Sequence, residues 1–317
     1  MSLNVPPWYM SKWSPHLREL TIYTVSVRLS EEEAKLLEKA CRRLVIYNPC
    51  FMLSEQDIAE IDEDFINRAV IRLNLGKIIE KVSNVLNSDS IVRHCKWFTI
   101  RFEHASPKDI ASQLYDTIRI CDDVGIVSNG LTYAFHVSRI DVGLILALMS
   151  DRVLMMDRER SWLRFNHIHL RPFVNDFDVE WRLFYINNRL VGASQYYTNL
   201  STRTSLGVPE PPDIEKMTKL AEEARRRIPG LDEMKNYTID IAFIRAPVKV
   251  EKNMLEYSSP VIIDINPLYR PGEKENEETY LGLFTWQELE ELYQKGRIEI
   301  RYMITLATRR EEHFNLT

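Results

Sequence analysis

The chain has 317 residues, of which 45% are hydrophobic and 27% charged, as in a globular protein with one large domain or two closely joined domains. Its 41 basic and 46 acidic side chains leave a net charge of -5, so we expect no non-specific binding to nucleic acid or to a membrane surface. Only 10 glycines are present, about half the usual frequency, so glycine-rich phosphate-binding loops should be scarce.

The N-terminal third is predicted to be rich in helices. Ser30 and Glu33 form a capping box that begins an amphipathic helix running to about Arg43. A second helix is expected from Ser54 and a third over 71–86.

A buried strand is expected next, followed by a helix with a complete start signal. The aromatic and β-branched run 97–102 predicts the strand. Ser106, Pro107 and Asp109 are typical of the N-cap, the first position and the first turn of a helix.

The second half mixes strands with fewer helices. Strands are predicted at 179–186, 189–196, 237–243 and 261–266. Asn187 and Asn188 suit the positive φ of the hairpin between the first two strands. Helices are expected at 214–228 and from the capping box at Thr285. This order predicts an α+β or mixed α/β fold with antiparallel strand pairs.

The strongest chemical signal is the strand that ends in Asp264, Ile265, Asn266 and Pro267. Side chains alternate along a strand, so Asp264 and Asn266 should share one face with Cα atoms roughly 6.5–7 Å apart. Two hard oxygen ligands suit Mg²⁺ held between protein and phosphates. Asp240 would join them if its strand pairs with this one. The alternative is a polar cluster at a strand end.

Two further segments are weaker candidates for binding an anion. Glu180 and Arg182 would form a surface ion pair, or, facing a cleft, would serve ribose or metal and a phosphate, respectively. The helix N-terminus at Ser106 would offer N–H groups to an anion, with charge added by Arg101 or Lys108; simple capping is the alternative.

Several familiar sites are excluded. The segment 125–132 has the glycine spacing of a P-loop, but Leu131 stands where the lysine is required. There is no GxGxxG and no GxSxG, so a Rossmann turn and an α/β-hydrolase elbow are not expected. His167 and His169 share a strand face as zinc ligands would, but no third ligand follows at a suitable spacing, which favours a structural role.

The cysteines and the apolar runs indicate the compartment. Cys41, Cys50, Cys95 and Cys121 have no metal-binding spacing and predict buried free thiols in a reducing environment. The longest apolar run, 142–149, is far shorter than the roughly 20 residues of a membrane-spanning helix, and no leader sequence is recognisable. We therefore expect a cytoplasmic protein without a membrane segment.

Taken in order, these segments resemble the cell-division-cycle 123 family from about Trp13 to Leu292. The most specific matches are the strand end 264–267 and the helix start Leu-Phe-Thr-Trp-Gln-Glu-Leu at 283–289. Further matches are Arg101 before Ser106-Pro107-Lys108-Asp109, the stretch 170–173, Glu180-Trp181-Arg182 and Ala193-Ser194-Gln195.

The resemblance implies an ATP-grasp fold, which is an α+β fold with mixed and antiparallel sheets in two subdomains that enclose a nucleotide cleft. It places a helix-rich N-terminal part at 1–95 and the first subdomain at 96–168. The second subdomain, with the hinge, the metal-binding strands and the C-terminal helix, falls at 169–317.

The resemblance also implies ATP and Mg²⁺ as cofactors. The ATP-binding positions that it implies are Arg101, Lys108, Leu170, Arg171, Pro172, Phe173, Glu180 and Arg182. The metal positions are Asp240, Asp264 and Asn266. Arg101 departs from the family, which usually has lysine there, and so keeps the charge but not the shape.

Two functional classes follow from the resemblance. The family implies an ATP-dependent assembly chaperone for a translation initiation factor 2-like partner or another protein client, with a large apolar patch for that client. The alternative is an ATP-grasp ligase that activates a carboxylate, or another acceptor, through an acyl phosphate in an open cleft. A third possibility is a nucleotide-binding module without turnover.

Overall fold

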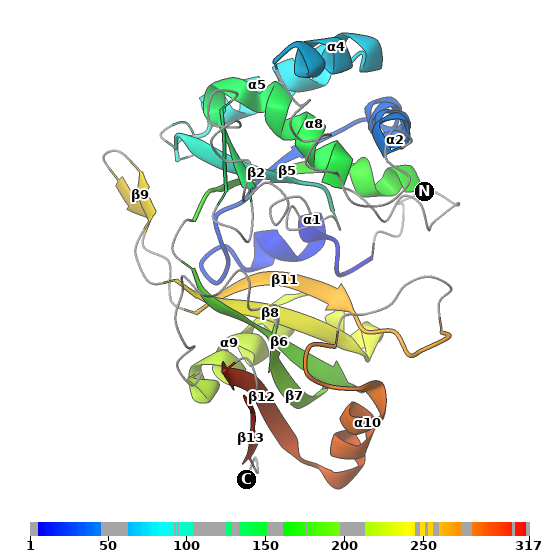
Figure 1. The fold of residues 1–317 in the computed structure, drawn as a ribbon, viewed down its shortest axis with the longest axis vertical. Helices are drawn as coiled ribbons and strands as arrows, with labels where there is room; N and C mark the ends of the chain where they lie inside the picture. The colour runs from blue at the N-terminus through cyan, green and yellow to red at the C-terminus, as the bar shows by residue number, and fades with distance from the viewer. Residues whose placement is uncertain are drawn as a thin grey trace. The chain divides into compact units, whose positions relative to one another are not determined.

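The computed structural model describes residues 6–45, 63–91, 93, 95–103, 125–128, 133–150, 161–174, 177–196, 213–244, 248–250, 253–255, 260–273, 281–305 and 308–314. The chain divides into two compact units, which we describe separately (Figure 1). Unit 1 comprises 1–22, 176–248 and 255–317, and unit 2 comprises 23–175 and 249–254. The subdomain boundaries expected from the resemblance stay a prediction.

Unit 2 is built on an antiparallel sheet whose strands lie in the order β1-β5-β2-β4-β3. The strands are β1 (Val25–Arg28), β2 (Trp97–Arg101), β3 (Ile126–Ser128), β4 (Tyr133–His136) and β5 (His167–Pro172). Its helices are α2 (Glu31–Val45), α4 (Glu63–Leu73), α5 (Gly76–Ser88) and α8 (Ile140–Ser150), with the short 3₁₀ turns Val137–Arg139 and Ser161–Phe165. Figure 1 shows the four helices gathered on one side of the sheet.

The sheet of unit 2 has one apolar and one polar face. Phe98 and Phe135 are directly opposite in β2 and β4 and therefore share a face. A Cβ at Gly143 of α8 would lie 2.3 Å from the Phe135 ring, so this is the face that α8 covers. Because side chains alternate, Thr99 and Arg101 project to the opposite face.

The helices of unit 2 follow from the sequence with one correction. Ser30 and Glu33 exchange the two hydrogen bonds of a capping box at the start of α2, as predicted. The single helix expected over 71–86 is wrong, because Asn74 adopts φ 56° and separates α4 from α5. The starts expected at Ser54 and Ser106 lie outside the described residues.

Unit 1 is built on a sheet whose strands lie in the order β11-β8-β6-β7-β12-β13. The strands are β6 (Phe177–Ile186), β7 (Arg189–Gln195), β8 (Tyr237–Ile244), β11 (Val261–Pro267), β12 (Ile298–Thr305) and β13 (Thr308–Phe314). Only β7 and β12 pair in parallel among these neighbours. Asn187 and Asn188 have φ 46° and 61°, which confirms the hairpin turn between β6 and β7. A separate pair consists of β9 (Val248–Val250) and β10 (Asn253–Leu255).

Each face of the unit 1 sheet carries its own hydrophobic core. Trp181, Leu183 and Ile239 face α1 (Met10–Trp13) and α9 (Ile214–Arg227). On the opposite face, Phe184 packs against Phe284 and the helix α10 (Trp286–Lys295). The 3₁₀ turns Ser14–His16 and Leu231–Met234 complete the regular structure of this unit.

The described cysteines, Cys41 and Cys95, are both buried free thiols, as predicted. Burial is the main cause that raises the pKa of Cys95 to about 11, and nearby Asp89 adds to it. In the part of the chain that the structure describes, no helix combines the length and the apolar character needed to cross a membrane.

Candidate functional site

A row of polar side chains crosses the α10 face of the unit 1 sheet. Its members are direct neighbours in the strand register, from β11 through β8, β6 and β7 to β12. In that order they are Asp264, Asp240, Arg182, Ser194 and Arg301. Phe184, two residues from Arg182, lies under α10, so the helix covers one part of this face and the row occupies another.

The strands that carry the predicted metal ligands pair as the sequence suggested. Asp264 lies opposite Asp240 in β8, and Asn266 donates a hydrogen bond from Nδ2 to Asp240 Oδ2 at 3.2 Å. A register shift between Ile262 and Asp264 marks a bulge in β11, after which Asp264 and Asn266 alternate with buried Ile265. The three side chains predicted to hold the metal therefore converge on one face.

Arg182 and Asp240 form a buried, two-pronged ion pair. The distances are 2.7 Å from Nε to Oδ1 and 2.8 Å from Nη2 to Oδ2, and the residues are only 4% and 2% exposed. The guanidinium also lies 4.2 Å from the centre of the Tyr196 ring. Burial favours the neutral form of Arg182, but the charge of Asp240 outweighs it and the pKa of Arg182 is raised.

This pair decides between the two interpretations of the Glu180 and Arg182 segment. Both side chains are buried, so a surface ion pair between them is excluded. Arg182 uses two nitrogens and one face of its guanidinium to hold Asp240 and Tyr196. Its contacts are those of a side chain that fixes the orientation of the Asp240 carboxylate.

The donor set at Asp240, Asp264 and Asn266 fits a hard divalent cation. The Asn266 amide donates through nitrogen, which leaves its carbonyl oxygen as a ligand, beside two carboxylates. Within the described ranges, no cluster of three or more His, Cys, Asp or Glu side chains has the arrangement of a metal site. An amide oxygen and phosphate oxygens would therefore have to complete the coordination shell of Mg²⁺.

The predicted nucleotide-binding residues of unit 2 lie on and around β2 and β5. Arg101 is opposite His169, and Arg171 is opposite Thr99, so both arginines belong to the polar face. Arg171 Nε donates to Thr24 Oγ1 at 3.0 Å. Leu170 is opposite Ile100 and belongs to the apolar face.

The remaining predicted positions fall near the end of β5 or beyond the described structure. Pro172 is buried at the end of β5, and the backbone N–H of Phe173 donates to Trp97 O at 2.9 Å. Lys108 lies outside the described residues.

One residue of the polar face in unit 2 escaped the sequence reasoning. Glu103 is 1% exposed and hydrogen-bonds both histidines, with Oε1 2.7 Å from His167 Nδ1 and Oε2 3.1 Å from His169 Nε2. The available signal was the alternation of Thr99, Arg101 and Glu103, which puts all three on one side of the chain.

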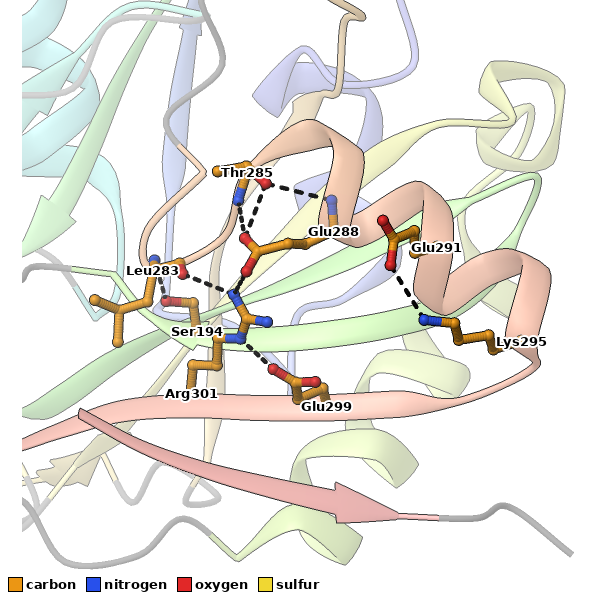
Figure 2. Close-up of polar contacts among 8 residues, drawn as sticks. All are labelled: Ser194, Leu283, Thr285, Glu288, Glu291, Lys295, Glu299 and Arg301. Carbon is orange, nitrogen blue, oxygen red and sulfur yellow. Dashed lines mark hydrogen bonds and ion pairs between the residues drawn. The ribbon is translucent and has the colours of Figure 1, made fainter.

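A second polar cluster holds the loop before α10 against the row (Figure 2). Arg301 contacts Glu299 and Glu288, donates to Leu283 O at 3.1 Å and lies over the Phe284 ring. Thr285 caps α10 in a complete capping box with Glu288, as predicted. The helix start that is most specific for the family is thus tied directly to the end of the row.

Ser194 makes the tightest contact with this loop. It accepts a hydrogen bond from Leu283 N at 2.9 Å, and a Cβ at Gly282 would lie 2.3 Å from its Oγ (Figure 2). Gly282 also has φ +62°, so this position requires glycine for both its backbone and its space.

Comparison with known families identifies the fold. A family model for an ATP-grasp domain, described as family 3 of its clade, matches residues 74–247, which is more than half of the chain. The chain belongs to this ATP-grasp family. Its mixed α+β architecture, with antiparallel and mixed sheets, is the ATP-grasp fold that the sequence predicted.

Similarities to solved ATP-grasp structures are more distant. Cdc123 from Schizosaccharomyces pombe is 16% identical over 92% of this chain and 94% of that chain, with a TM-score of 0.48. A C-terminally truncated form of the same protein is 16% identical over 90% of each chain, with a TM-score of 0.45.

D-alanyl-alanine synthetase A from Vibrio cholerae O1 biovar eltor str. N16961 is 11% identical over 69% of this chain and 56% of that chain, with a TM-score of 0.31. A comparison with curated protein sequences found no match. The solved structures to which this ATP-grasp chain is similar thus include Cdc123, whose family it resembles in sequence.

Proposed function

We propose that this ATP-grasp protein binds ATP together with Mg²⁺, and that Asp240, Asp264 and Asn266 hold the metal. The observation that carries the proposal is the pairing of β8 with β11, which brings two carboxylates and one amide to the same face. Membership of an ATP-grasp family supports the nucleotide.

Each predicted residue has a role in this proposal. Arg101 and Lys108 neutralise phosphate charge, Glu180 serves the ribose, and the stretch 170–173, with Arg171, forms the adenine hinge. Arg182 orients Asp240, consistent with the two hydrogen bonds between them. When bound, Mg²⁺ supplies charge neutralisation at the phosphates.

We further propose that nucleotide binding serves the assembly of a protein client similar to translation initiation factor 2, in the cytoplasm. Its support is the sequence resemblance to the cell-division-cycle 123 family. The large apolar patch expected for a client is absent from the described residues, where Ile71 is the exposed large hydrophobic side chain. The client would therefore bind through polar contacts or through segments outside those ranges.

Two experiments on the full chain test these proposals. Calorimetric titration with ATP should show binding in the presence of Mg²⁺ and much weaker binding in EDTA; absence of binding in both would overturn the nucleotide site. A pulldown from the native host should recover a translation initiation factor subunit in an ATP-dependent manner. ADP release that depends on an added carboxylate and amine would replace the chaperone with the ligase alternative.

A further inference from the structure

Unit 2 contains a hydroxyl, an imidazole and a carboxylate joined in series. Ser26 Oγ lies 2.8 Å from His169 Nδ1, and His169 Nε2 lies 3.1 Å from Glu103 Oε2. Ser26 and His169 are direct neighbours in the β1–β5 register. His169 is 0% and Glu103 1% exposed, whereas Ser26 is exposed.

The hydrogen bonds assign the protons in this series. An ionised carboxylate only accepts hydrogen bonds, so His169 carries its proton on Nε2, toward Glu103. The other ring nitrogen, Nδ1, is then an acceptor, and Ser26 must donate to it. This is the arrangement of a nucleophile, a general base and an orienting group.

The surroundings keep His169 in the form that a base needs. Burial is the largest cause that lowers its pKa, and the nearby positive charge of Arg101 acts in the same direction, against the raising effect of Glu103. The imidazole is therefore neutral near pH 7 and able to take a proton.

The charge on this face favours a phosphoryl group as the electrophile. Ser26, His169 and Arg101 form one row across β1, β5 and β2. Adjacent strands are about 4.8 Å apart, so the Cα atoms of Ser26 and Arg101 are roughly 10 Å apart, within reach of an arginine side chain and a phosphate between them. Arg171 adds a second guanidinium to the same face.

We propose that Ser26 accepts the γ-phosphoryl group of ATP, with His169 as the general base and Glu103 as its positioning residue. The proposal rests on the ATP binding proposed above. The Ser26 oxygen forms a bond to the γ-phosphorus, the bond from that phosphorus to the bridging oxygen breaks, and ADP leaves. The hydroxyl proton passes to His169 Nδ1.

The direct test incubates the full chain with radioactive γ-labelled ATP and Mg²⁺ and maps the label by mass spectrometry. Wild type should carry one phosphoryl group on Ser26, Ser26→Ala none, and His169→Gln should be labelled at least about 100-fold more slowly. For Glu103, Glu103→Asp should recover part of the labelling rate that Glu103→Gln loses, which a purely structural role would not produce.

The chain provides a matched control in a second serine–histidine pair. Ser138 Oγ lies 2.7 Å from His136 Nδ1, and within the described ranges His136 has no carboxylate partner. Ser138→Ala should therefore leave the labelling unchanged. Label on Ser138, or on any residue other than Ser26, would overturn the proposal.

Two parallel measurements separate this inference from the proposed function. A fluorophosphonate probe needs no ATP, because the serine oxygen displaces fluoride from phosphorus, and it should label wild type but not Ser26→Ala. Calorimetry on the same samples reports ATP binding. Bound ATP without phosphorylated Ser26 overturns the inference alone, absence of ATP binding overturns both, and failure of the probe overturns the activated hydroxyl.

Discussion

Replacing Arg182 with alanine is expected to lower the free energy of unfolding by about 3–5 kcal/mol, because it leaves a buried carboxylate without its ionic partner. Asp240 is 2% exposed and accepts both nitrogens of the arginine fork, at 2.7 and 2.8 Å. After the substitution, the Asn266 amide is the remaining hydrogen-bond donor that the structure gives to Asp240. Urea unfolding followed by circular dichroism measures the loss.

Arg226 provides the matched surface control for this prediction. Its pair with Glu223 belongs to α9 and leaves the arginine side chain 72% exposed, so Arg226→Ala should cost less than about 1 kcal/mol. The double variant Arg182→Leu/Asp240→Leu should recover much of the loss, since no buried charge remains. If Arg182→Ala were as stable as Arg226→Ala, the buried pair would not have the role described here.

Arg301→Leu is expected to lower the free energy of unfolding by about 3 kcal/mol. Arg301 is the partner of buried Glu299, contacts Glu288 at 2.7 Å and donates to Leu283 O at 3.1 Å (Figure 2). Burial acts to raise the pKa of Glu288, but the Thr285 N–H and Arg301 outweigh it and lower that pKa. The substitution therefore removes support from both Glu299 and the capping box of α10.

Lys295 is the control on the same helix. Its ion pair with Glu291 is 3.1 Å long, with side chains 57% and 51% exposed, so Lys295→Ala should change the stability by less than about 0.5 kcal/mol. Proteolysis should also separate the two variants, because only Arg301→Leu frees the loop before α10. Equal stability and equal cleavage of the two variants would contradict the role assigned to Arg301.

The local structure of this chain was largely predictable from its sequence. The capping boxes at Ser30 and Thr285 and the Asn187-Asn188 turn depend on hydrogen bonds or dihedral preferences within a few residues, and all three are found. The separation of α4 from α5 was not predictable, because the apolar spacing continues across Asn74, whose left-handed φ carries no strong sequence signal.

The candidate site was predictable in its members but not in their partners. Alternation in the strand placed Asp264 and Asn266 on one face, and the pairing of β8 with β11 brought Asp240 beside them. That Arg182 holds Asp240, rather than Glu180, depends on the order of strands in the sheet, which the sequence does not encode locally. Glu103 was missed for the same reason, since its histidine partners lie 64 and 66 residues away.

The most direct test of the central claim is the calorimetric titration of Asp264→Ala with ATP in the presence of Mg²⁺. Asp264 is opposite Asp240 on the face proposed to hold the metal, and it is partly exposed, so its removal should cost little stability. Glu215→Ala, in an exposed position of α9, is the control. We predict binding to wild type and to Glu215→Ala and none to Asp264→Ala; an unchanged ATP affinity in folded Asp264→Ala would contradict the assignment of the site.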